Sequence, residues 1–205
     1  MKYDYIKQYA KSNIIDTSLI KRITNGGFSN SDLNLIKYWQ KKHKIEKLRK
    51  GLYFFSDSLV SVNPVIFAYQ IYNPSYISLE YALSYYSIIP EAVSIVTSVT
   101  TKKTKSFKNN FAFYEYRKIK SEAFGGYKVL FNNNISYFMA LPEKALVDWL
   151  YLNRHKLNGD KEEFESFRFS HSFRYNKSRI KEFASKFKNK KTKKLSLKFI
   201  EYAAE

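Results

Sequence analysis

The sequence predicts an α+β fold, with three helices and a β-hairpin in residues 1–58 and a mixed α/β unit with a basic helical tail in residues 59–205. Apolar residues recur at helical spacing towards both ends of the chain. Runs of β-branched and aromatic residues, bounded by Gly, Asn and Pro, alternate with helical patterns in the middle. Residues 59–100 contain no Lys or Arg, so a folding core is expected there.

Two short helices are expected in the first 24 residues. Asp16 or Thr17 can cap the second helix, which should end near Thr24 because residues 25–27 (NGG) tolerate positive φ. The first helix covers residues 2–11, and its inward face is expected to contain Tyr5, Ile6, Tyr9 and Ala10.

A third helix should begin after Ser29, which can act as its N-cap. Asp32 stands at the third helical position and can complete a capping box. The inward positions at a period of 3.6 are Leu33, Ile36, Trp39 and Gln40. The opposite, polar face consists of Asn30, Ser31, Asn34, Lys37, Tyr38 and Lys41.

A hairpin is expected next, with strands at residues 45–49 and 52–55 joined by a Lys50-Gly51 turn. Three helices followed by a basic hairpin is the order of a winged helix-turn-helix, whose third helix enters the major groove of DNA. Asparagines can bond adenine or the backbone, whereas Lys and Arg neutralise phosphates. The predicted DNA-binding residues are Asn30, Ser31, Asn34, Lys37, Tyr38, Lys41, Lys47, Arg49 and Lys50. The alternative is a three-helix cap with a hairpin that contacts only protein.

The middle of the chain should alternate helices and strands. Residues 64–71, 76–86 and 141–151 are expected to be helices, and residues 92–100, 111–119 and 127–130 to be strands. Residues 161–205 should form amphipathic helices that pack on this unit. The polar residues Ser78, Glu80, Glu143 and Asp148 are interpreted as helix caps, first-turn acids and ion-pair partners.

The net charge of +18 indicates a polyanionic partner, because such a field attracts nucleic acids. An AT-rich genome would also raise the Lys content, yet Asp and Glu together number only 18. No apolar run is long enough for a membrane span, no signal peptide is evident and there is no Cys, so a cytoplasmic protein without a membrane partner is expected. The three His lack metal-ligand spacing and no nucleotide or hydrolase motif occurs, so neither enzymatic activity nor a cofactor is expected.

Five segments together resemble the AbiEi family of type IV antitoxins, over about residues 45–152. They are residues 48–53 (LRKGLY), 74–83 (PSYISLEYAL), 89–91 (IPE), 97–100 (TSVT) and 141–148 (LPEKALVD). The resemblance implies a winged DNA-binding domain that represses its own operon, and a C-terminal domain that counters a nucleotidyltransferase-like toxin without a stable complex. The alternatives are a stand-alone winged-helix transcription factor, and an enzyme or RNA-binding factor acting on the toxin's target.

Overall fold

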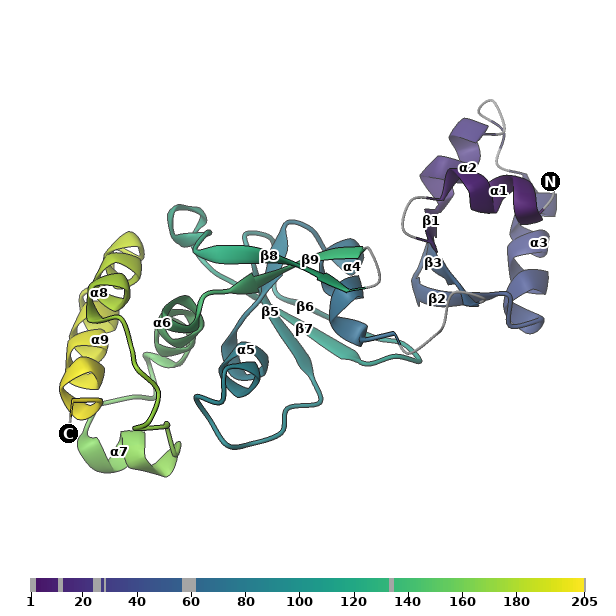
Figure 1. Cartoon of the computed structure of the whole chain (residues 1–205). Coiled ribbons are helices and arrows are strands. Elements are labelled where there is room, and N and C mark those ends of the chain that lie inside the picture. Colours follow the sequence, from purple (N-terminus) through teal and green to yellow (C-terminus); the bar gives the residue numbers. More distant parts are fainter. Residues whose placement is uncertain are drawn as a thin grey trace.

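The chain has a mixed α+β fold, with a small N-terminal unit beside a larger body built around a sheet (Figure 1). The computed structural model describes residues 3–10, 13–23, 27, 29–56, 62–132 and 135–204. The predicted boundary between residues 58 and 59 lies outside these residues. No helix within them is long and apolar enough to cross a bilayer.

In its described residues, the N-terminal unit combines three α-helices with a three-stranded sheet in the order β1-β3-β2. Its core contains Ile6, Ile20, Ile36 and Trp39 from the helices, and Phe55 from the sheet. The predicted helices and hairpin are confirmed, whereas β1 was not expected. The elements are α1 (Tyr3–Tyr9), β1 (Ile14–Asp16), α2 (Thr17–Ile23), α3 (Asn30–Lys41), β2 (Ile45–Arg49) and β3 (Leu52–Phe55).

The predicted inward faces of two helices in this unit are only partly right. On α1, Ile6 packs inward and so does Ala10 just after the helix, as predicted, but they are joined by Tyr3, whereas Tyr5 and Tyr9 are about half exposed. Tyr3 makes edge-to-face contacts with Trp39 and Phe55, with ring centroids 5.3 and 5.2 Å apart. On α3, Leu33 is 40% exposed, whereas Leu35 packs beside Ile36 and Trp39.

The larger body contains a six-stranded mixed sheet in the order β6-β7-β5-β4-β9-β8. The β5–β7 and β4–β9 pairs are parallel, and the other neighbours are antiparallel. Strands β6 and β8 are its edges. The strands are β4 (Ser75–Ile77), β5 (Val96–Thr100), β6 (Lys105–Lys108), β7 (Phe113–Lys118), β8 (Tyr127–Asn132) and β9 (Ile135–Ala140).

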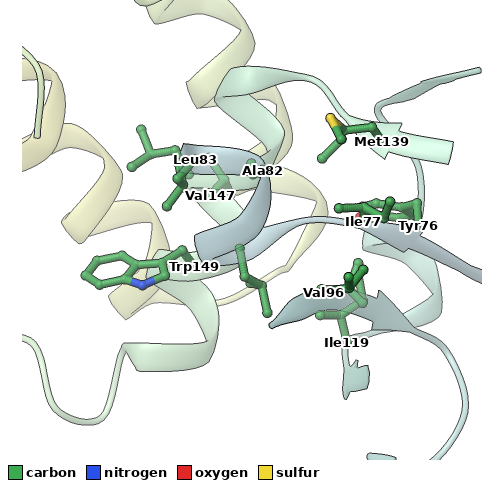
Figure 2. Close-up of a cluster of buried hydrophobic side chains, with 14 of the residues drawn as sticks. Tyr76, Ile77, Ala82, Leu83, Val96, Ile119, Met139, Val147 and Trp149 are labelled. Carbon is green, nitrogen blue, oxygen red and sulfur yellow. The ribbon is translucent and has the colours of Figure 1, made fainter. Parts of the chain in front are cut away.

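Helices α5 and α6 pack against each other beside this sheet, and Figure 2 shows Leu83 of α5 next to Val147 of α6. The tail helices α8 and α9 then pack on α6, as predicted. Phe187 at the end of α8 stacks on Tyr151 at a centroid distance of 4.1 Å. The helices of this body are η3 (Pro64–Phe67), α4 (Ala68–Ile71), α5 (Leu79–Tyr85), η4 (Ser121–Ala123), α6 (Pro142–Asn153), α7 (Lys161–Ser166), α8 (Lys177–Lys186) and α9 (Lys190–Tyr202).

Two predictions for the middle of the chain are wrong, and a third holds only in part. Residues 76 and 77 belong to β4 rather than to a helix, because they are buried between β5 and β9. Ser78 occupies the N-cap position of α5, as predicted, but makes no side-chain cap bond, since its hydroxyl donates to Asp148 instead. The strand expected from residue 92 begins at Val96.

The strand β3 belongs to both cores, which joins the two units. Tyr53 and Phe55 face the N-terminal core, whereas Leu52 and Phe54 face the core of the larger body. Phe54 lies edge-to-face on Phe67 at 4.9 Å. All four residues of β3 are buried, so this strand of the hairpin is enclosed by protein on both faces.

Candidate nucleic-acid interface

The start of α3 is held by the predicted capping box. The Asp32 backbone N–H donates to Ser29 Oγ at 3.3 Å, and the Ser29 N–H donates to Asp32 Oδ2 at 3.0 Å. The bond from the Ser29 backbone N–H, followed by that from its hydroxyl, lowers the pKa of Asp32 below its ordinary value. The box therefore fixes the first turn of the helix on which most predicted DNA contacts lie.

The two faces of α3 differ sharply. Ile36 and Trp39 are 2% and 4% exposed and anchor the helix in the N-terminal core. All six residues of the predicted polar face are exposed: Asn30, Ser31, Asn34, Lys37, Tyr38 and Lys41. The structure thus brings the six together as one polar and basic stripe open to solvent.

The three predicted DNA-binding residues of the hairpin differ in their exposure to solvent. Lys47 and Lys50 are exposed. Arg49 is half-buried, and its Nε donates to the carbonyl of Ile71 at 2.8 Å while Nη1 donates to the carbonyl of Lys50 at 3.0 Å. Arg49 therefore links the hairpin to the larger body, which the sequence interpretation did not foresee.

The turn between β2 and β3 is tied to the start of α2. Gly51 adopts φ +77°, which suits glycine because it lacks a Cβ. The Thr17 backbone N–H donates to the Gly51 carbonyl at 3.0 Å. Asp16 Oδ1 accepts from the Leu19 N–H at 2.7 Å and so caps α2, which decides between the two predicted caps. These bonds fix the hairpin relative to the helices.

Sequence reasoning missed lysines that lie beside the hairpin. Lys102, Lys105 and Lys108 line a groove together with Lys47 and Arg49. The excess of basic residues between positions 101 and 148 was a signal. This excess did not show where the lysines would lie, because they approach the hairpin only in the tertiary fold.

The basic tail forms a separate surface. Helices α8 and α9 lie at the opposite end of the molecule from α3 (Figure 1), so the two basic surfaces do not meet. The basic residues between positions 174 and 194 are all exposed: Arg174, Lys177, Arg179, Lys181, Lys186, Lys188, Lys190, Lys191, Lys193 and Lys194.

Across the ranges that the structure describes, His, Asp and Glu side chains form no group of three suited to hold a metal ion. Comparisons with models of known protein families and with characterised proteins return no match.

Proposed function

We propose that residues 3–56 are a winged helix-turn-helix and that the protein is a DNA-binding transcription regulator. The element order α1-β1-α2-α3-β2-β3, with the hairpin completed by β1, supports this assignment. The observation that carries the proposal is the polar face of α3, whose six residues are all exposed while the opposite face anchors the helix. An α-helix of this kind fits the major groove of B-DNA.

The side chains of the stripe and of the hairpin turn suit two different roles in DNA binding. Asn30 and Asn34 have amide groups that can pair with adenine edges or with the backbone. Lys37 and Lys41 on α3, and Lys50 at the hairpin turn, supply positive charge to phosphates. The asparagines would therefore contribute sequence preference, and the lysines would contribute position and affinity.

The proposed physiological role is autorepression combined with antitoxin activity in the cytoplasm. It rests on the resemblance to AbiEi antitoxins. The five segments of this chain that carry the resemblance lie in the hairpin, in β4 and α5, between α5 and β5, in β5, and at the start of α6. Ser78, Lys144 and Asp148 from these segments form one buried polar network. The functional partner would be a nucleotidyltransferase-like toxin that is countered without a stable complex.

DNA binding is tested with the full-length protein and duplex from its own upstream region. Asn34→Ala and Lys50→Glu should each weaken binding at least tenfold, because one removes a base contact and the other reverses a charge at the phosphates. Lys191→Glu in the tail is the matched charge control and should have little effect. Wild-type affinity in both interface variants would show that α3 and the hairpin are not the DNA face.

Antitoxin activity is tested by co-expression with the adjacent gene. Full-length protein carrying both Asn34→Ala and Lys50→Glu should lose repression and still rescue growth, if the larger body counters the toxin. The full chain is used because β3 is shared by both cores. An adjacent gene without toxicity would favour the stand-alone transcription factor.

A further inference from the structure

A groove separates the hairpin from the first edge strand of the six-stranded sheet. One wall is β2, the edge of the small sheet, and the other is β6 with the residues before it. The cavity volume is about 540 Å³. Spaces of roughly 300–1,000 Å³ are typical of sites that hold small organic ligands. The groove therefore has room for nucleotide-sized groups.

The walls of the groove are strongly basic. Of the described residues that line it, none is acidic. The cationic side chains along the two walls are Lys47, Arg49, Lys50, Lys102, Lys105 and Lys108. With this charge the groove is complementary to a chain of phosphates.

Two aromatic rings lie among these cations. Tyr72 and Phe107 are half-buried, with ring centroids 5.8 Å apart. The Nζ of Lys102 stands 5.6 Å from the Tyr72 centroid, and the Nζ of Lys105 stands 5.1 Å from the Phe107 centroid. Aromatic faces interleaved with cations are the combination by which proteins hold unpaired bases and their phosphates together.

Hydrogen bonds hold the two walls in place. The Arg49 Nε donates to the Ile71 carbonyl at 2.8 Å, and Asn109 Nδ2 donates to the Leu48 carbonyl at 3.1 Å. The hydroxyl of Tyr72 donates to the Lys103 carbonyl at 3.1 Å. The groove is thus formed before any ligand enters.

We propose that this groove binds single-stranded nucleic acid, with phosphates along the lysines and a base against Tyr72 and Phe107. Duplex DNA would contact the rim lysines and leave the rings unused, because its bases are stacked inside the helix. A single strand presents both phosphates and the faces of its bases. This activity goes beyond promoter binding and does not depend on the polar face of α3.

The first experiment measures fluorescence anisotropy of labelled oligothymidylate, twelve nucleotides long, with the full-length protein. The triple variant Lys102→Glu, Lys105→Glu, Lys108→Glu should weaken binding at least tenfold. The matched control Lys181→Glu, Lys191→Glu, Lys194→Glu makes the same change of net charge in the tail and should weaken binding less than about threefold. Equal weakening by both would mean attraction by overall charge alone and would overturn the proposal.

The same variants are then tested on a duplex of unrelated sequence. The groove variant should lose more affinity for the single strand than for the duplex. If it loses as much for the duplex, the lysines contact flanking duplex and the proposal fails. Asn34→Ala should leave oligothymidylate binding unchanged, so this result and the promoter result can fail separately.

A second measurement tests the aromatic contact without changing any charge. Phe107→Leu keeps an apolar side chain and should weaken oligothymidylate binding severalfold, with an unchanged salt dependence. In the wild-type protein, an oligothymidylate carrying one 4-thiothymidine should photo-cross-link to the peptide with Tyr72 or Phe107. Cross-links confined to α3 or to the tail would contradict the assignment, whatever the fold of the leucine variant.

Discussion

The Ser78 hydroxyl donates a 2.8 Å hydrogen bond to the carboxylate of Asp148, 70 residues further along the chain. Tyr76 Oη donates to the same carboxylate at 3.0 Å, and Lys144 Nζ donates to its other oxygen. Burial raises the pKa of Asp148 and lowers that of Lys144, while their attraction opposes both shifts. The network connects β4 to α6 through groups that have no access to water.

Removal of one partner from this buried pair should be strongly destabilising. Asp148→Ala leaves the Lys144 ammonium buried without a counter-charge, at an expected cost of about 3–5 kcal/mol. The double variant Lys144→Met, Asp148→Leu removes both charges and should lose much less. Urea unfolding of the three proteins gives the comparison. A double variant less stable than Asp148→Ala would show that the unpaired charge of Lys144 is not what destabilises the Asp148→Ala protein.

Neighbouring residues at the hairpin turn should respond differently to truncation. Arg49→Ala removes a charged donor to the Ile71 carbonyl and should lower stability by about 1.5–3 kcal/mol. Lys50→Ala alters an exposed side chain and should change stability by no more than about 0.5 kcal/mol. Equal thermal stability of the two variants would argue against a structural role for Arg49.

Gly51 should tolerate few replacements. Its φ of +77° is unfavourable for alanine, and a Cβ would stand 3.1 Å from Thr17 Oγ1. Gly51→Ala should cost about 1–2 kcal/mol in chemical unfolding. Gly51→Asn should cost less, because asparagine enters the left-handed region more readily. The reverse order of stabilities would place the strain elsewhere in the turn.

The capping box of α3 should make stability depend on pH in the acidic range. The folded-state pKa of Asp32 is lowered by the bonds from Ser29. Its stabilisation is therefore complete above the unfolded value of about 3.9 and is lost as pH falls through the folded value. Asp32→Asn should remove this dependence, so the stability difference between wild type and variant should shrink on acidification. A stability difference between wild type and Asp32→Asn that stayed constant with pH would contradict the role of the Asp32 carboxylate in the capping box.

The proposed promoter binding should weaken with salt in proportion to the number of phosphates that the protein neutralises. Loss of one phosphate contact lowers the slope of log K against log salt by about 0.9. Lys37→Ala and Lys50→Ala should each show this change, whereas Asn34→Ala should reduce affinity with the slope unchanged. Slopes measured by fluorescence anisotropy from 50 to 300 mM salt provide the test, and an altered slope in Asn34→Ala would point to an indirect effect.

Local signals predicted the N-terminal unit well. Ser29 and Asp32 define a helix start by their spacing, and Lys50-Gly51 defines a tight turn, so both features could be recognised without tertiary information. The prediction of which residues face inward on these helices was less accurate. A seven-residue helix such as α1 has few contacts, and Tyr5 cannot be distinguished by type from Tyr3, which packs.

The features that the sequence did not predict depend on contacts between residues far apart in the chain. The strand Ser75–Ile77 is short and precedes a helical pattern, and its pairing with β5 and β9 determines its conformation. Ser78 has the residue type of an N-cap, yet Asp148 attracts its hydroxyl. The groove lysines gave only a regional charge excess, because β2 and β6 come to line the same groove only in the folded protein.

The double burial of β3 has a consequence for protein engineering. A chimaera that exchanges the N-terminal unit for that of another protein would lose Leu52 and Phe54 and would expose the part of the larger core that they cover, unless the incoming hairpin offered matching apolar side chains. The surface of Phe67 and Phe111 would need to be redesigned at the same time. Because the two units share this strand, the proposed DNA-binding surface is more readily altered by substitutions on the outer side of α3 than by domain exchange.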